Sequence, residues 1–180
     1  MIVRHAEKPT RGKPYGLRRS GAIDKESLTT RGWQRAGALA RLFAPADGCF
    51  RDAALATPAT IAASRVDRKC GGASRRPKQT VVPLAELLGL PIDTRFQKGD
   101  EAAVMAAMLA GTGVVLIAWE HEHIPALVAA LPGAPDVPAA WPDDRFDLVW
   151  VFDATPGGWT LTQVPQLLLA GDSTAVVPLA

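Results

Sequence analysis

The sequence has little cysteine and no strong excess of charge of one sign. Cys49 and Cys70 are the only cysteines in 180 residues, and they form no metal-binding or redox spacing. Two cysteines are too few for a disulfide framework, so we expect reduced thiols. With 20 basic and 18 acidic residues the formal net charge is only +2, so whole-chain electrostatics indicate neither nucleic-acid nor membrane binding.

The sequence also lacks the features of a signal peptide and of a membrane span. Met1-Ile2-Val3 leads to Arg4 without a basic start or a long apolar segment, which favours a cytoplasmic protein. A strand this short before Arg4 leaves open a start upstream of Met1. Residues 102–119 carry no charge, but Gly111-Thr112-Gly113 divides them into a helix and a strand, so we expect no membrane span.

Strand and helix patterns alternate along the chain and end in a hairpin. A length of 180 residues with 48% hydrophobic content suits one domain, residues 1–180. Apolar runs predict strands at 1–3, 59–63 and 113–119, and helical spacing and caps predict helices at 30–43, 77–88, 101–112 and 126–131. Residues 147–153 and 158–164 flank a Thr-Pro-Gly-Gly turn typical of a hairpin. Together these predict an α/β fold: a three-layer α/β/α sandwich with a mostly parallel mixed central sheet and a C-terminal antiparallel hairpin.

Two of the helices carry more detailed expectations. In the helix at 30–43, a stripe of residues at intervals of three and four is predicted to face the core: Trp33, Ala36, Gly37, Ala40 and Phe43. In the helix at 77–88, Pro77 suits the first turn, whereas Pro83 is expected to bend or split the helix. Arg76 is therefore expected at a helix N-terminus, where free backbone amides favour phosphate.

Two of the predicted strands lead directly into histidine. The first run ends in Arg4-His5-Ala6-Glu7, and the run at 113–119 ends in Glu120-His121-Glu122-His123. In open α/β sheets, side chains just beyond the carboxyl ends of parallel strands converge and form the ligand site. The repetition therefore predicts one site that contains both histidine segments.

Four segments of the chain carry a family resemblance. They are Val3-Arg4-His5-Ala6-Glu7-Lys8-Pro9, Ser27-Leu28-Thr29-Thr30-Arg31-Gly32 with Gln34-Arg35-Ala36, Arg76-Pro77-Lys78-Gln79-Thr80, and Trp119-Glu120-His121-Glu122-His123-Ile124-Pro125. In sequence and in order they resemble the signature segments of the histidine phosphatases, the superfamily that includes the phosphoglycerate mutases and the acid phosphatases. The resemblance spans most of the chain and implies the same three-layer α/β fold.

The resemblance assigns four residues to the phosphate. His5 and His121 fall on the family's two histidine positions, and Arg4 and Arg76 on its phosphate-binding arginine positions. A histidine can attack phosphorus when its reacting nitrogen is unprotonated and the other nitrogen donates to a fixed carbonyl. His5 is the expected nucleophile, with the arginine forks and a protonated His121 as donors to the phosphoryl oxygens. Replacing Arg4 or Arg76 by alanine should lower turnover by about a hundredfold or more.

The leaving alcohol also needs a proton, and a carboxylic acid is the expected donor. Glu122 is the first choice because it directly follows His121, as an aspartate follows the second histidine in the acid phosphatase branch that the segment resembles. Glu7 and Glu120 remain alternatives. Glu7 suits a salt bridge to a site arginine, and alternation along an extended chain would turn Glu120 away from the side of His121.

A metal site is the main alternative for the histidines. His121 and His123 lie two apart, so on an extended segment they share a face and could bind a metal together with His5. No cysteine or aspartate lies at ligand spacing to complete the set, and the paired arginines would repel a cation. We therefore expect neither a metal nor another cofactor.

Two basic loops, residues 11–19 and 65–78, are expected to border the site and favour an anionic substrate. The loop at 65–78 lacks interleaved aromatics, so we expect no nucleic acid as a partner. A small phosphorylated molecule is the expected substrate, and a phosphoprotein is compatible with the same chemistry. The sequence does not define the oligomeric state.

These observations predict a metal-independent phosphomonoester hydrolase that acts through a phosphohistidine on His5. A phosphomutase would use the same nucleophile but must keep water from the phosphoenzyme, and 180 residues leave little chain for a closing cap. A phosphate-recognising interaction module without turnover is the alternative from another class.

Overall fold

The computed structural model of the protein describes residues 1–10, 13–66 and 74–179. Arg11, Arg68, Lys69 and Cys70, which belong to features discussed above, lie outside these residues. From the N-terminus the elements are β1 (Ile2–Arg4), α1 (Thr30–Phe43), β2 (Thr60–Ala63), α2 (Arg76–Leu88), β3 (Ile92–Asp93), α3 (Glu101–Leu109), β4 (Val115–Trp119), the 3-10 turn η1 (His121–His123), α4 (Ile124–Ala129), β5 (Leu148–Thr155) and β6 (Gly158–Pro165).

The strands form one sheet in the order β3-β2-β4-β1-β5-β6. The first four strands in this order are parallel, whereas β5 runs antiparallel to β1 and to β6. The mixed sheet and the C-terminal hairpin confirm the predicted α/β fold class. The two-residue strand β3 was not predicted, because so short a segment carries no detectable alternation.

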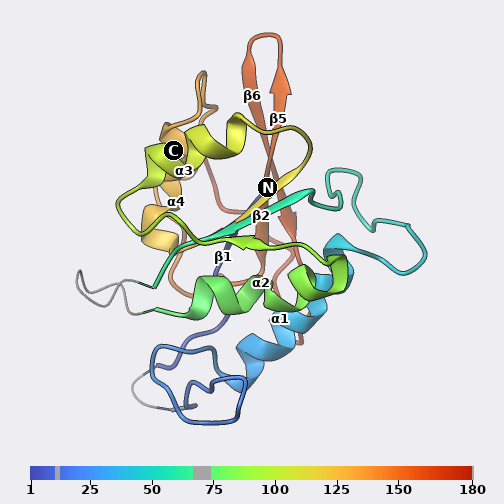
Figure 1. The fold of residues 1–180 in the computed structure, drawn as a ribbon. Coiled ribbons are helices and arrows are strands. Elements are labelled where there is room, and N and C mark those ends of the chain that lie inside the picture. The colour runs from blue at the N-terminus through green and yellow to red at the C-terminus, as the bar shows by residue number, and fades with distance from the viewer. Residues whose placement is uncertain (11–12, 67–73, 180) are drawn as a thin grey trace.

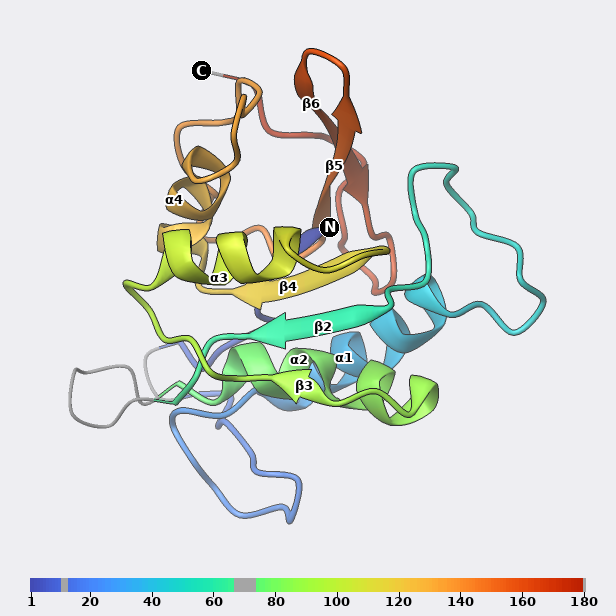
Figure 2. The ribbon, with the colours of Figure 1, turned by 45° about the horizontal axis from the view of Figure 1, so that its top comes forward.

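Helices cover both faces of the sheet, with α1 and α2 on one face and α3 and α4 on the other (Figures 1 and 2). Neighbouring residues of a strand point to opposite faces. Accordingly, Val3 packs in the cluster that contains the α1 and α2 side chains, whereas Ile2 packs with those of α3 and α4. Strands buried on both faces explain why their sequences are continuous apolar runs rather than alternating patterns.

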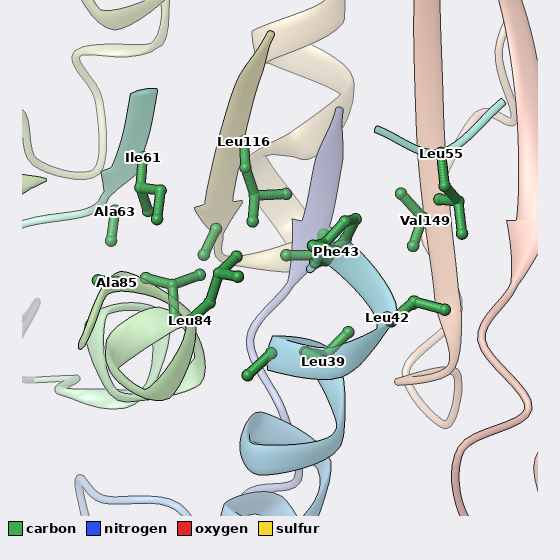
Figure 3. Close-up of a cluster of buried hydrophobic side chains, with 14 of the residues drawn as sticks. Leu39, Leu42, Phe43, Leu55, Ile61, Ala63, Leu84, Ala85, Leu116 and Val149 are labelled. Carbon is green, nitrogen blue, oxygen red and sulfur yellow. The ribbon is translucent and has the colours of Figure 1, made fainter. Parts of the chain in front are cut away.

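The face covered by α1 and α2 is filled by aliphatic side chains around one aromatic ring (Figure 3). Phe43 is fully buried where α1 meets the sheet, and Leu84 of α2 and Leu116 of β4 belong to the same cluster. Fully burying one such side chain contributes about 1.5–3 kcal/mol of transfer free energy. This packing fixes α2 against β2 and β4, and so fixes the position at which α2 begins.

Two details of the helices differ from the prediction. The buried stripe of α1 is rotated from the predicted one: Gly37 is exposed, and Arg35 and Leu39 are buried instead. Arg35 is buried because carboxylates meet its guanidinium there, a contact that hydrophobic spacing cannot indicate. Of the two effects expected of Pro83, a bend or a split, the split does not occur, because α2 continues through Pro83 to a left-handed C-cap at Gly89.

Among the residues that the structure describes, no helix combines the length and the hydropathy needed to cross a membrane. The uncharged run at 102–119 is divided, as predicted, into helix α3 and strand β4.

Candidate functional site

Strands β1 and β4 bring the two histidine segments together. The strands are parallel neighbours in which Arg4 pairs with Trp119, so both chains leave the sheet at the same edge. The backbone N–H of His5 donates to the carbonyl of Trp119 at 3.0 Å, which extends the pairing by one residue. The predicted convergence of the segments is therefore present: the rings of His5 and His121 meet edge to face, with centroids 6.4 Å apart.

His5 is held in one orientation by its own backbone. Its Nδ1–H donates to the carbonyl of Ala6 at 2.8 Å, and its side chain is only 3% exposed. This contact fixes the tautomer and leaves Nε2 as the nitrogen with a free lone pair. Burial lowers the pKa of His5 to about 3, and the nearby charges of Arg4, Arg76 and Lys8 add to that effect. The ring is therefore neutral near neutral pH.

The backbone that follows His5 is tied to two helices. Thr80 of α2 accepts from the N–H of Ala6 at 2.8 Å, and Thr29, the N-cap of α1, donates its N–H to the carbonyl of Glu7 at 3.0 Å. Gly32 packs so closely here that an added Cβ would lie 2.6 Å from the Glu7 carbonyl oxygen. The end of β1 is thus a rigid support for the histidine.

Arg4 is buried, and only one of its three guanidinium nitrogens forms hydrogen bonds with described residues. Its Nη1 donates to the carbonyls of Pro142, Asp143 and Arg145 at 2.7–3.1 Å, and its guanidinium lies 3.9 Å from the centre of the Phe146 ring. Its Nε and Nη2 are buried and have no hydrogen-bond partner within the described part of the chain. Burial lowers the pKa of Arg4 to about 10, which keeps it charged at neutral pH.

Arg76 is the first residue of α2, as predicted. Its Nη2 donates to the carbonyl of Lys25 at 2.6 Å and lies 3.4 Å from a carboxylate oxygen of Glu26. Its Nε is buried without a partner. Burial lowers the pKa of Arg76 as well, against the opposing effect of nearby carboxylates.

His121 is bound by an aspartate that the sequence analysis did not identify. Its Nε2–H donates to the Oδ1 of Asp143 at 2.5 Å, although the Asp143 side chain is 85% exposed. Burial and the charge of Arg4 lower the pKa of His121. The protonated His121 of the sequence analysis is therefore not favoured in this structure, although a bound dianion would favour it.

The three candidate glutamates differ in their surroundings. Glu7 accepts from Arg31 and Arg35, both on α1, so it forms the expected salt bridge but not with Arg4 or Arg76. Glu122 is exposed. Glu120 has one oxygen bound to a serine and the other buried without a partner, and burial raises its pKa.

A pocket of about 180 Å³ collects most of these groups. Its lining residues are His5, Lys8, Glu26, Ser74, Arg76, Lys98, Glu120, His121 and Glu122. Arg4 is not among them, because the loop at 142–146 covers its Nη1. Glu120 and Glu122 both line the pocket, contrary to the expectation that Glu120 turns away, because η1 ends the extended alternation at His121.

The structure does not bring His5, His121 and His123 together as a metal site. His123 contacts Glu101 at 3.0 Å and does not line the pocket with His5 and His121. Within residues 1–10, 13–66 and 74–179, no three side chains of histidine, cysteine, aspartate or glutamate are grouped so that they could hold a metal ion.

A larger cavity of about 440 Å³ lies at the opposite edge of the sheet, where β4 begins. It is lined mainly by apolar side chains such as Met105, Met108 and Trp159, and it contains no histidine. The chemistry described above is confined to the smaller pocket.

Comparison with known proteins adds no assignment: no protein-family model and no curated protein matches the chain. The sequence had indicated His5, Arg76, His121 and Glu122 as site residues and Glu120 as an alternative acid, and all five line the pocket. It gave no signal for Asp143 or Phe146, which follow the proline-rich connector at 132–142 and reach the site only through the fold.

Proposed function

We propose that the protein is a metal-independent phosphomonoester hydrolase that acts through a phosphohistidine on His5. The observation that carries this proposal is a neutral, buried His5 surrounded by cationic donors without partners. Three of the six buried side-chain polar atoms that lack a hydrogen bond among the described residues are guanidinium nitrogens of Arg4 and Arg76. Leaving a buried polar atom unpaired costs about 1–3 kcal/mol, so such atoms indicate a ligand that pairs them.

An anion with several oxygens fits these donors best. Arg76 lines the pocket and has an unpaired Nε–H, and Arg4, directly before His5 but outside the pocket lining, has two further unpaired nitrogens; arginine matches phosphate oxygens well. The transition state of phosphoryl transfer spreads charge over three oxygens, so catalysis depends mainly on fixed cationic donors. A pocket of about 180 Å³ accommodates a phosphoryl group and a small part of its alcohol.

The proposed reaction has two steps. The lone pair on Nε2 of His5 attacks phosphorus, the bond from phosphorus to the leaving oxygen breaks, and that oxygen takes a proton as the alcohol departs. Water then attacks the phosphohistidine, the P–N bond breaks, and inorganic phosphate leaves with His5 restored. The Ala6 carbonyl stabilises the positive charge that His5 carries while Nε2 is phosphorylated.

The test compares phosphate release from para-nitrophenyl phosphate by wild type, His5→Ala and His123→Ala in a chelating buffer. We expect activity in the wild type and in His123→Ala, whose histidine pairs with Glu101 outside the pocket, and none in His5→Ala. A radiolabelled substrate quenched in denaturant should leave an acid-labile label on the wild type and on His123→Ala, but not on His5→Ala.

Three results would contradict the proposal. Activity lost in chelator and restored by zinc would favour a metal route. Tight binding of phosphorylated ligands without turnover or label would favour an interaction module. Transfer of the phosphoryl group mainly to an added alcohol rather than to water would favour a phosphomutase.

A further inference from the structure

The identity of the proton donor follows from how the three nearby glutamates are held. Glu7 does not line the pocket, and two arginines of α1 bind its carboxylate. Glu122 lines the pocket, but its side chain is exposed and no described residue forms a hydrogen bond with it. A general acid must reach the leaving oxygen in a defined position; the carboxylate of Glu7 is bound elsewhere, and no described contact fixes the carboxylate of Glu122.

Glu120 is positioned by the sheet itself. It is the first residue after β4, and its Oε1 accepts from the hydroxyl of Ser64, the first residue after β2, at 3.0 Å. Strands β2 and β4 are parallel neighbours, and the N–H of Ser64 bonds to the Ala118 carbonyl. The carboxyl group is therefore supported from two adjacent strands.

The second oxygen of Glu120 is the informative atom. Oε2 is buried and has no hydrogen-bond partner among the residues that the structure describes, although the side chain borders the same pocket as His5 and His121. A buried carboxylate oxygen without a donor is costly, whereas a neutral carboxylic acid avoids the charge. A proton on Oε2 then needs an acceptor, and a substrate oxygen in the pocket would be one.

The surroundings of Glu120 also favour a protonated carboxyl group. Burial raises the pKa of Glu120 and outweighs the opposing effects of the Ser64 hydroxyl, of the backbone N–H of Glu120 and of the charges of Lys98 and His123. Nearby, His5 has a lowered pKa, again mainly through burial. The environment therefore favours the uncharged form of both side chains, the carboxyl of Glu120 and the imidazole of His5, which line the same pocket.

We infer that Glu120, rather than Glu122, protonates the leaving alcohol, and that the substrates are accordingly alkyl phosphomonoesters. The inference rests on the proposed phosphohistidine route. In the first step the proton moves from Oε2 of Glu120 to the leaving oxygen as its bond to phosphorus breaks. In the second step the Glu120 carboxylate takes a proton from the attacking water, which restores the acid.

The substrate class follows from the presence of such an acid. An aryl phosphate releases a stable phenolate and gains little from protonation, whereas an alkyl phosphate releases a strongly basic alkoxide unless an acid protonates it. A fixed neutral acid beside the nucleophile is therefore useful for sugar, glycerol or phosphoserine esters. These esters share the chemistry of an aliphatic alcohol that leaves from phosphorus.

The test compares Glu120→Gln with wild type on two substrates, para-nitrophenyl phosphate and glycerol phosphate. Glutamine keeps the shape and can still accept from Ser64, but it cannot supply the proton. We expect kcat/KM, which covers the steps up to alcohol release, to fall about a hundredfold or more for glycerol phosphate and less than about threefold for the aryl ester. A burst of para-nitrophenol should also appear, because the phosphohistidine then awaits water without a base.

The comparison variant is Glu122→Gln, whose effect should be the same on both substrates. Glu120→Asp keeps an acid with shorter reach, so its activity on glycerol phosphate should lie between those of wild type and Glu120→Gln. It also serves as the test if the glutamine variant does not fold.

Three outcomes would overturn the inference: equal losses on both substrates in Glu120→Gln, a substrate-dependent loss in Glu122→Gln instead, or a Glu120→Asp variant no more active on glycerol phosphate than Glu120→Gln. If wild type forms no phosphohistidine, the proposed function itself fails. If wild type does form it and Glu120→Gln behaves as wild type on both esters, only the inference fails.

Discussion

Replacing Arg76 by alanine separates catalysis from stability at the proposed phosphate site. Arg76 donates to the Lys25 carbonyl at 2.6 Å, and its contacts with Glu26 and Ser74 are long, at 3.4 Å. Losing one hydrogen bond from a charged donor costs about 1.5–3 kcal/mol, so the variant should still fold. A chain of this size loses roughly 2–4 °C of melting temperature for each kcal/mol.

Arg76→Ala should lower kcat/KM by more than its loss of stability can explain. If Nε and Nη1 of Arg76 pair with phosphoryl oxygens, alanine removes a preorganised donor from the transition state. Such a donor contributes about 10²–10³ in rate, or about 2.7–4 kcal/mol. We therefore expect kcat/KM for phosphomonoesters to fall at least about a hundredfold, with inorganic phosphate becoming a weaker inhibitor.

The adjacent Arg75 provides a matched control. Its Nε pairs with Asp24 at 3.0 Å, and its side chain does not line the pocket. Arg75→Ala removes the same charge one residue away, at the cost of a partly exposed ion pair worth about 0–1 kcal/mol. Equal kcat/KM values for the two variants, or unchanged phosphate inhibition in Arg76→Ala, would refute the assignment of Arg76 to the phosphate.

Three further predictions concern the support of the site. The pKa of His5 is about 3 in the folded protein and 6.5 ordinarily, so as the pH falls below 6.5 His5 is protonated in the unfolded chain but not in the folded protein. Protonation of His5 in the unfolded chain should therefore lower the free energy of unfolding by about 2 kcal/mol between pH 7 and pH 5. Urea unfolding measures this loss, and His5→Ala should lack it. Asp172→Asn weakens a buried ion pair with Arg35 and should lower the free energy of unfolding by about 3 kcal/mol. Gly32→Ala places a Cβ 2.6 Å from the Glu7 carbonyl and should lower kcat/KM about tenfold or more by displacing the segment after His5.

Each of these has its own control and contradicting result. A parallel loss of stability with pH in wild type and His5→Ala would contradict the buried neutral histidine. Asp136→Asn changes an exposed aspartate and should leave the urea midpoint nearly unchanged; a similar result for Asp172→Asn would show that the ion pair contributes nothing. Gly37→Ala lies on the same helix with open space around it, so it should be neutral or stabilising, and equal activity of the two glycine variants would contradict the close-approach argument.

The sequence predicts the regular elements well where local chemistry defines them. Thr29 caps α1 through its hydroxyl, where the sequence allows Thr29 or Thr30, and Gly89 ends α2 in the left-handed region, so local chemistry defines both boundaries to within a residue. The convergence of His5 and His121 was predictable because parallel strands bring their carboxyl ends to one edge.

The remaining features depend on contacts between distant segments. The position of Asp143 beside His121 is set by a loop that carries no regular pattern. Glu120 was placed wrongly because an extended chain was assumed beyond β4, whereas η1 turns the backbone at His121. The burial of Arg35 likewise depends on Asp172, which lies more than a hundred residues along the chain.

The loop over Arg4 makes the protein suitable for a label-free optical measurement. The carbonyl of Arg145 accepts from both Nη1 of Arg4 and the indole N–H of Trp141, and the Trp141 ring lies against Trp150, with centroids 4.8 Å apart. An indole whose hydrogen bond or ring contact changes alters its emission. A ligand that draws the Arg4 guanidinium away from this loop should therefore shift tryptophan fluorescence, and binding could be titrated without any turnover.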